Sequence, residues 1–290
     1  MHVKIKTLTP LWTGDIDGEC NKIKETGIIG SLRWWYEALV RGLGGYACDI
    51  TSNNSLEKCD YYRDKDRICD ACRLFGCTGW SRRFRIETEY NEDNFENFLD
   101  YKCEKEFKIK IIELFSLSEM QKWGLWSILY IISKYGTIGA KNMLKPSNKP
   151  FYYDWGQVEI IWNESDFIKP VIEKQSIKES LHKPLFKKDY LPNLRYFIFS
   201  PEESLSSSQY WQLKKFDPFF YGKINPAKAN KFASFKNQKR FWGYTTTNNG
   251  LYATTLEKLE NLGLKNLVKG SDIIEKELFS SINGDEKNEL

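Results

Sequence analysis

Residues 27–37 and 69–80 together decide the fold of this chain. The first stretch reads Gly27-Ile28-Ile29-Gly30-Ser31-Leu32-Arg33-Trp34-Trp35-Tyr36-Glu37, and the second reads Cys69-Asp70-Ala71-Cys72-Arg73-Leu74-Phe75-Gly76-Cys77-Thr78-Gly79-Trp80. From Leu32 to Leu43, apolar residues recur at spacings of three and four, the period of an amphipathic helix. Ser31 is a favoured N-cap residue, and Gly42 is a residue type that ends helices. We therefore predict a helix that begins after Ser31 and ends near Gly42.

The start of this helix is a candidate anion site. Gly30 precedes the expected N-terminus, where backbone N–H groups have no partner inside the helix and the helix dipole is positive. Arg33 lies in the first turn, and Arg41 follows on the same polar stripe. The alternative is an ordinary amphipathic surface helix whose arginines pair with Glu37.

The second stretch belongs to a cysteine-rich segment. Cys69 and Cys72 have the spacing of a zinc knuckle, and Cys48, Cys59 and Cys77 lie nearby. Four thiolates around a tetrahedral Zn2+ explain such a group. Disulfides are disfavoured because the chain has seven cysteines and its first residues do not form a secretory segment. We predict a structural zinc ion, with free cysteines as the alternative.

Composition places the chain among globular proteins. Of its 290 residues, 41% are hydrophobic and 15% aromatic, and the formal net charge is only +4. This small charge gives no whole-chain electrostatic argument for nucleic acid. The sequence has no run close to the roughly 18 apolar residues of a membrane span, so we expect no membrane contact and a cytoplasmic protein.

Catalytic residues are scarce. The chain has two histidines, His2 and His182, and neither is near an acid cluster or a cysteine in the sequence. Most acid–base and nucleophilic catalysis uses histidine, and the signature of zinc deaminases is missing. The sequence therefore favours a closed, structural zinc site in a non-catalytic protein. Asp15 and Asp17 are the residues to suspect if the chain cleaved RNA.

The first half of the chain has a recognisable order of elements. We expect strands over residues 2–9, 82–89, 107–115 and 157–162, and a second helix over residues 119–135 that is capped within residues 116–118. The order strand, helix, strand, strand, helix, strand is that of a ferredoxin-like domain, with the cysteine-rich segment (about residues 44–80) inserted after the first helix. RNA-recognition domains share this topology, but their aromatic motif is missing from the third strand.

The second half is predicted to be richer in helices. We expect a strand over residues 194–199 and helices over residues 173–181, 206–215, 227–240, 256–268 and 272–281, with Asn225 and Pro226 at the start of the third. Residues 214–242 combine lysines with aromatic residues, which predicts an RNA or subunit surface, or a packed helix pair. The fold class is α+β, with two ferredoxin-like domains: residues 1–165 with the zinc-knuckle insertion, and the helix-rich residues 166–290.

Three motifs together resemble the RAMP proteins of CRISPR systems. They are residues 27–35, the knuckle followed by Arg73-Leu74-Phe75-Gly76, and the loop Gly136-Thr137-Ile138-Gly139-Ala140-Lys141. Within this superfamily the sequence is most similar to the family of first subunits of the Cmr complex, the type III-B RNA-guided effector. The resemblance implies a non-catalytic subunit that caps the complex near the 3′ end of the guide RNA (crRNA), helps to capture target RNA and contacts other Cmr subunits.

The resemblance also implies particular site residues. It matches RNA-contacting positions to Gly30, Ser31, Arg33, Gly136, Gly139 and Lys141. It further implies Cys48, Cys59, Cys69 and Cys72 as zinc ligands, with Cys77 as the alternate, because related proteins often have a small residue at the position of Cys77.

Side-chain chemistry adds four candidates to this set. Trp34 lies off the apolar face and is a candidate for base stacking, although it is equally a candidate for the core or an interface. Arg41, Arg82 and Arg83 are candidate phosphate contacts, although the last two could line a solvated strand face. Two other functions stay open: an endoribonuclease of the same superfamily that processes guide precursors, and a stand-alone zinc-knuckle RNA-binding protein.

Overall fold

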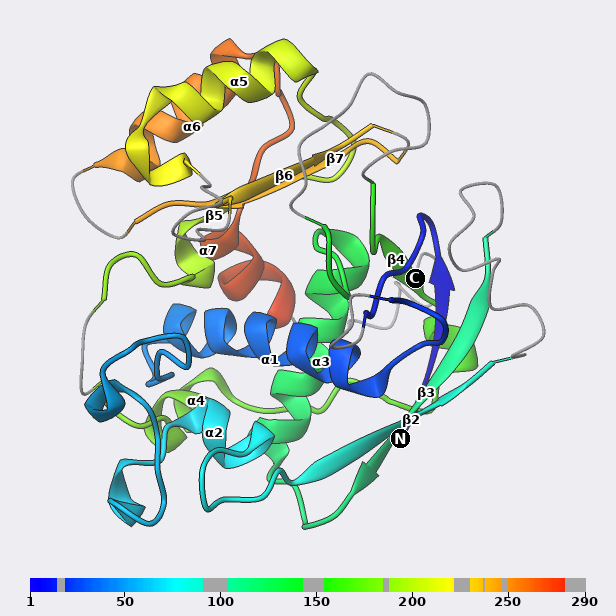
Figure 1. Cartoon of the computed structure of the whole chain (residues 1–290), viewed down its shortest axis with the longest axis vertical. Helices are drawn as coiled ribbons and strands as arrows, with labels where there is room; N and C mark the ends of the chain where they lie inside the picture. The colour runs from blue at the N-terminus through cyan, green and yellow to red at the C-terminus, as the bar shows by residue number, and fades with distance from the viewer. Residues whose placement is uncertain are drawn as a thin grey trace.

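A computed structural model of the chain describes residues 1–14, 19–90, 104–142, 154–184, 188–221, 230–236, 238–246 and 250–279. Its first half builds a four-stranded antiparallel sheet with two long helices packed against it (Figure 1). The elements are β1 (His2–Thr7), α1 (Glu25–Gly42), β2 (Phe84–Glu89), β3 (Glu106–Glu113), α3 (Glu119–Lys134) and β4 (Val158–Ile160). Along the chain, these six elements follow the predicted ferredoxin-like order of strand, helix, strand, strand, helix, strand. In the sheet, the strands lie in the order β2-β3-β1-β4.

Local sequence explains these elements. In β1, Val3, Ile5 and Thr7 are buried and alternate with partly exposed residues, as in a strand with one face on the core. Val3 pairs with Ile109 of β3, and Ile5 pairs with Ile160 of β4. Helix α3 begins with a capping box between Ser118 and Gln121, which satisfies the backbone N–H groups at its start.

Helix α1 begins earlier than predicted. Its first residue is Glu25 and its N-cap is Lys24, so Ser31 lies inside the helix and is not its cap. The loop at Thr13 extends the helix, because the Thr13 hydroxyl accepts the Lys24 N–H (2.9 Å). Gly27 allows this close approach, since a Cβ there would lie 2.5 Å from the Thr13 carbonyl oxygen. The helix start predicted beside Gly30 is therefore wrong, and the free N–H groups of a helix N-terminus are not found there. RNA contacts by Gly30 and Ser31 stay predictions.

The second half repeats the same order of elements. It contains β5 (Phe197–Ser200), α5 (Ser207–Phe216), β6 (Phe232–Phe235), β7 (Arg240–Tyr244), α6 (Leu251–Asn261) and β8 (Val268–Lys269). These strands form a second antiparallel sheet in the order β6-β7-β5-β8. The helical turns α7 (Gly270–Asp272) and η7 (Ile273–Leu278) follow it. The predicted boundary between residues 165 and 166 stays a prediction.

The helix predicted over residues 227–240 is wrong. Where this segment is described, it forms the β6-β7 hairpin, and the proposed cap residues Asn225 and Pro226 lie outside the described residues. Both faces of these strands are buried: Phe232 and Phe241 pack in the cluster with α5 and α6, whereas Trp242 packs in the larger cluster with α1. A strand buried on both faces has no polar alternation for a sequence pattern to detect.

Shorter pieces complete the chain. Between α1 and β2 lie η1 (Ser55–Glu57), η2 (Lys65–Arg67) and α2 (Asp70–Phe75); after β4 come η4 (Trp162–Glu164), α4 (Lys174–Ser180), η5 (Leu194–Tyr196) and η6 (Pro218–Phe220). Among the described residues, no helix combines the length and apolar character needed to cross a bilayer.

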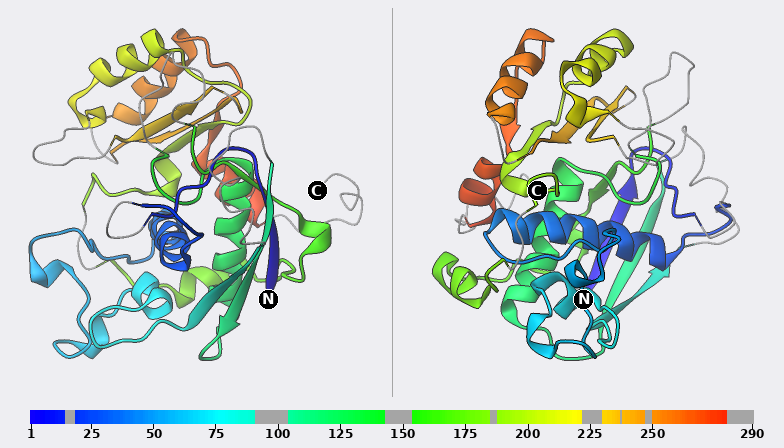
Figure 2. Two further views of the ribbon diagram at one scale, coloured as in Figure 1. Left: turned by 45° about the vertical axis from the view of Figure 1, so that its right-hand side comes forward. Right: turned by 60° about the vertical axis from the view of Figure 1, so that its left-hand side comes forward.

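The two sheets share a core. Helices α5 and α6 lie on the outer side of the second sheet, while α1 and α3 lie between the two sheets (Figure 2). One apolar cluster accordingly contains Val3 and Ile109 of the first sheet together with Phe197 and Trp242 of the second. The molecule is thus layered, and α1 touches residues from both halves.

Arg240 links the second sheet to the end of α3. Its buried guanidinium donates to the carbonyl oxygens of Ser133 (3.1 Å) and Gly136 (2.9 Å), at the helix end where the dipole favours a cation. Burial lowers the pKa of Arg240 to about 10, which leaves the side chain charged at neutral pH.

We predict that Arg240→Met lowers the free energy of unfolding by about 2–3 kcal/mol, because it leaves buried carbonyl oxygens without donors. Chemical denaturation of the full chain measures this effect. The control is Lys239→Met at the exposed neighbouring position, for which we expect little change. Equal stability of the two variants would contradict the role of Arg240.

Candidate functional site

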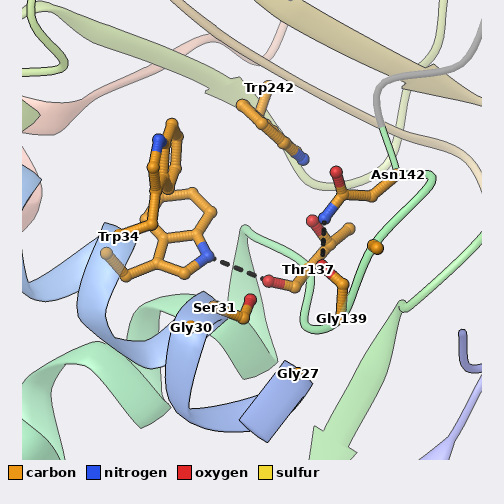
Figure 3. A pocket seen from close by; sticks show the side chains of 10 residues that line it. Gly27, Gly30, Ser31, Trp34, Thr137, Gly139, Asn142 and Trp242 are labelled. Atoms are coloured by element: carbon orange, nitrogen blue, oxygen red, sulfur yellow. Dashed lines mark hydrogen bonds between the residues drawn. The ribbon is translucent and has the colours of Figure 1, made fainter. Parts of the chain in front are cut away.

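A cavity of about 320 Å3 lies where α1, the loop after α3 and strand β7 meet (Figure 3). It is lined by Gly27, Gly30, Ser31, Trp34, Trp35, Thr137, Gly139, Ala140, Asn142 and Trp242. Two of the motifs that carry the resemblance, in α1 and in the glycine-rich loop, therefore face one space although they are far apart in the sequence. Four of the predicted RNA-binding residues, Gly30, Ser31, Trp34 and Gly139, line it.

Trp35 holds the glycine-rich loop against α1. Its indole Nε1–H donates to the Thr137 carbonyl oxygen (2.9 Å), as the dashed line in Figure 3 shows. Gly136 must be a glycine for packing, since a Cβ there would lie 2.6 Å from the Trp35 ring. Gly139 has φ +84°, and a Cβ there would lie 2.6 Å from the Trp12 carbonyl oxygen. Both glycines thus shape the loop that forms one wall of the cavity.

Trp34 is part of an aromatic wall and not a free surface ring. Its ring contacts those of Trp35, Trp242 and Tyr244 at centroid distances of 4.9, 5.7 and 6.1 Å. In Figure 3 the nitrogen of the Trp242 indole points toward the loop that carries Asn142. The cavity therefore combines aromatic walls from both halves of the chain with polar groups from the loop.

Two buried polar groups of the lining residues have no hydrogen-bond partner among the described residues. They are the Thr137 hydroxyl and the Trp242 indole N–H. Thr137 is 0% exposed and Trp242 is 1% exposed. Such groups are rare in folded proteins because burying them without a partner is costly.

The predicted zinc ligands form a compact cluster. The sulfur atoms of Cys48, Cys59, Cys69 and Cys72 all lie within 4.8 Å of one another, and all four residues are buried. The Cys72 N–H donates to Cys69 Sγ (3.4 Å), and the Cys69 N–H donates to Cys59 Sγ (3.2 Å), as is typical of knuckle turns. Cys77, the alternate ligand, lies outside this cluster and is half-buried.

The chemistry of this cluster fits a divalent cation. Contacts with the thiols of Cys48, Cys59 and Cys69 raise the pKa of Cys72, since crowded thiols cannot all ionise without a cation among them. Four thiolates are the donor set of closed structural zinc sites. Bound there, Zn2+ would cross-link the cysteine-rich segment between α1 and β2.

Arg33 joins this cluster to α1. Its guanidinium donates to Cys72 Sγ (3.0 Å), to the Gly76 carbonyl oxygen (2.8 Å) and to Glu37 (2.9 Å). Burial lowers the pKa of Arg33, but the negative charges of Cys72 and Glu37 outweigh it and raise the pKa overall. Arg33 therefore stays charged and partly neutralises the thiolates.

Arg41 has a similar role further along α1. It donates to the carbonyl oxygens of Cys48 (2.9 Å) and Pro192 (3.1 Å), and it also pairs with Glu37. RNA contacts by Arg33 and Arg41 stay predictions, and the groups that would make them are engaged within the chain.

A family model described as the RAMP superfamily matches residues 4–270. The chain belongs to the RAMP superfamily. It is also similar to the crystal structure of Cmr1 from Pyrococcus furiosus in its apo form, with a TM-score of 0.45 and 12% sequence identity over 93% of this chain and 98% of that one. No curated protein matches the chain significantly.

Of the remaining predicted RNA-binding residues of this RAMP protein, Lys141 is the neighbour of two cavity-lining residues, whereas Arg82 and Arg83 are not among the residues that line the cavity. Lys141 adjoins the lining and holds its ammonium group 3.0 Å from the centroid of the Trp12 ring, a cation–π contact. It adopts φ 61°, which is unusual for a residue with a side chain. Arg82 and Arg83 lie between the cysteine-rich segment and β2, where Arg83 packs over the rings of Trp80 and Phe115.

Sequence reasoning missed two features of the site. Trp242 could have been suspected from the aromatic character of residues 214–242, but the cavity that it lines is formed by distant segments. The His182 side chain, taken as isolated, contacts the buried carboxylate of Asp70 beside the cysteine cluster. Asp15 and Asp17, the residues suspected of cleavage, lie outside the described residues.

We predict that the wild-type chain carries about one zinc ion and that Cys69→Ser/Cys72→Ser removes it. The double variant loses stability in the first half of the chain, because metal-binding energy is folding energy there. Elemental analysis and thermal unfolding of the purified chain measure both effects.

Cys77→Ser is the matched control, because Cys77 lies next to the cluster but outside it. This variant should keep its zinc. Full zinc retention in the double variant, or loss of zinc in the control, would contradict the ligand set.

Proposed function

We propose that this RAMP protein is a non-catalytic RNA-binding subunit of a type III-B CRISPR (Cmr) effector complex. In this proposal it caps the assembly near the 3′ end of the guide RNA, helps to capture target RNA in the cytoplasm, and contacts other Cmr subunits. The observation that carries the proposal is the convergence of the α1 motif and the glycine-rich loop on one cavity.

The glycine at position 30 is an argument for a ligand that lies against α1. It is exposed inside α1, and a Cβ added there would meet no atom of the described residues within 4 Å. Glycine in a helix interior costs about 0.5–1 kcal/mol relative to alanine. Packing explains Gly27 and Gly139 but not Gly30, and the close approach of a sugar–phosphate backbone to α1 would explain it.

The charged side chains near the cavity suit a subunit that positions RNA within a complex better than a chain that binds RNA tightly by itself. Lys141 lies next to the lining residues Ala140 and Asn142, where its ammonium group could meet a phosphate. Arg33 and Arg41 are engaged in internal hydrogen bonds. With a net charge of +4, the isolated chain should bind RNA weakly and gain affinity from its neighbours in a complex.

Purification of the tagged full chain from its own cells tests the proposal. We expect it to carry several other subunits and small RNAs with a defined 5′ sequence. A chain that purifies alone and binds RNA tightly would favour the stand-alone zinc-knuckle protein. A chain that cleaves guide precursors, with loss of cleavage in Asp15→Ala, would favour the endoribonuclease.

We predict that Gly30→Ala raises the free energy of unfolding by about 0.5–1 kcal/mol. In contrast, Gly30→Leu keeps the helix but extends a side chain into the space that the RNA would use. The Leu variant should therefore retain less guide RNA in the purified complex, measured per mole of protein.

Ala253→Leu, at an exposed position of α6, is the control for adding a leucine to a helix surface. It should retain guide RNA like the wild type. Undiminished RNA in Gly30→Leu would contradict RNA binding over this part of α1.

A further inference from the structure

We propose that the outer face of the cysteine-rich segment docks a neighbouring protein whose contact surface carries carboxylates between apolar side chains. At the centre of this face lie Tyr61, Tyr62, Trp80, Arg83 and Phe115, which together form the aromatic ridge. The inference rests on the proposed function, because a complex would supply the neighbouring protein. It goes further than subunit contacts in general, since it assigns one contact to named side chains and states the chemistry of its partner.

The aromatic ridge is a continuous row of contacts between rings and a cation. The Tyr61 ring lies 6.5 Å from the Tyr62 ring and 5.2 Å from the Trp80 ring, measured between centroids. The guanidinium carbon of Arg83 lies 5.5 Å from the centroid of the Trp80 ring and 5.5 Å from that of the Phe115 ring. Cation–π contacts of this kind hold the guanidinium over the rings. The row therefore connects the cysteine-rich segment with the turn that follows β3.

Several side chains of the ridge are exposed although they are large and apolar. Tyr62 is 83% exposed and Phe115 is 53% exposed, and Leu114 beside it is 49% exposed. Single apolar residues on a protein surface are ordinary, but grouped ones mark places where another molecule covers them. Tyr62 and Phe115 belong to one row of contacting side chains, so their exposure indicates a binding surface.

The backbone beneath the exposed rings is held in one conformation. The Tyr61 N–H donates to the Thr78 carbonyl oxygen (2.9 Å), which joins the two turns that carry the ridge. The Asp60 carboxylate accepts the Tyr62 N–H (3.0 Å). Gly79 has φ +74°, and a Cβ there would lie 2.8 Å from the Tyr62 ring. A surface that is ordered before it binds loses less conformational entropy in the complex.

Basic side chains around the ridge define the charge of the partner. Among the described residues, no acid forms an ion pair with four of them: Arg63, Lys65, Arg82 and Arg83. Other basic side chains of this region are paired, as Arg67 is with Asp64 (3.6 Å). Carboxylates on the partner would complement the four unpaired charges and steer the approach of its surface.

The composition of the face favours a protein over RNA. Tyrosine, tryptophan and arginine are the residues most often found at the centre of protein interfaces, and the ridge contains all three. Leu114 adds aliphatic surface, which suits a protein but gives a base nothing to stack on. The acids Asp64 and Asp66 alternate with basic residues, so the face carries charge of both signs and the acids oppose a polyanion.

The ridge lies away from the cavity. In Figure 1 and Figure 2 the cysteine-rich segment lies on the side of α1 that is turned away from the second sheet. The cavity lies on the other side, where β7 contributes Trp242 to its lining, and the ridge residues are not among those that line it. The chain could therefore hold RNA on one side of α1 and a neighbouring protein on the other.

Carbodiimide cross-linking of the complex purified from its own cells tests the inference. The reagent joins an ammonium group to a carboxylate that touches it, and Lys65 holds its ammonium group at the ridge, 5.5 Å from the centroid of the Tyr61 ring. We expect mass spectrometry to find Lys65 linked to an aspartate or glutamate of one other protein of the complex. A Lys65 that is linked only to acids of its own chain would overturn the inference.

Tyr62→Ala removes the most exposed ring of the ridge. Because this side chain is 83% exposed, the variant should fold like the wild type, but the complex should retain about fivefold less of the protein to which Lys65 is linked. Ile168→Ala is the matched control, because Ile168 is an apolar side chain of similar exposure (79%) outside the ridge. It should retain that protein like the wild type. Equal retention in both variants would contradict docking at the ridge.

RNA is the alternative occupant of this face, since Arg82 and Arg83 are candidate phosphate contacts. Guide RNA is therefore measured per mole of the chain in the same samples. Loss of guide RNA in Tyr62→Ala, with every protein of the complex retained, would make the ridge an RNA surface and overturn the inference.

The same preparations separate the inference from the proposed function. A complex with guide RNA in which Lys65 is linked to no other protein would overturn docking at the ridge and leave the RNA-binding subunit standing. A link from Lys65 to another protein, in a preparation that carries no guide RNA, would support the docking surface and overturn the Cmr subunit. A chain that purifies alone would overturn both.

Discussion

The position of Trp35 is the constraint on which the rest of the molecule depends. Its ring contacts Phe197 and Trp242 of the second sheet at centroid distances of 5.6 and 5.5 Å, and its N–H holds the glycine-rich loop. Because the ring fills the space beside Gly136, the loop can pass close to α1 only without a side chain there. One residue thus fixes the mutual position of α1, the loop and the second sheet, and with them the cavity.

The two arginines of α1, Arg33 and Arg41, use their charged groups for contacts within the chain. Arg33 and Arg41 use their donors on the cysteine-rich segment, where Arg33 meets the Cys72 sulfur and Arg41 meets the Cys48 carbonyl oxygen. A zinc ion held by four thiolates would carry net negative charge, and the half-buried Arg33 beside it would offset that charge. The polar stripe of α1 therefore supports the cysteine-rich segment, while Gly27, Gly30, Trp34 and Trp35 of the same helix line the cavity.

Much of the first half could be predicted because its signals are local: the alternation in β1, the cap at Ser118 and the cysteine spacing. The start of α1 could not, since the contact of Thr13 with the first turn decides it. The β6-β7 hairpin was mistaken for a helix because both faces of its strands are buried, although the polar residues 236–239 between two aromatic runs could have signalled a turn. Trp242 reaches the cavity only through tertiary packing, which no local pattern encodes.

We propose that RNA lies over the junction of α1 and the glycine-rich loop, and the proposed function depends on this position. Ultraviolet cross-linking of the chain in the complex purified from its own cells, followed by mass spectrometry of the cross-linked peptides, tests it most directly. We expect cross-links in the peptide that carries Trp34 and in the peptide that spans residues 137–142. Guide RNA that is retained by the complex but cross-links this chain only at other places would contradict it.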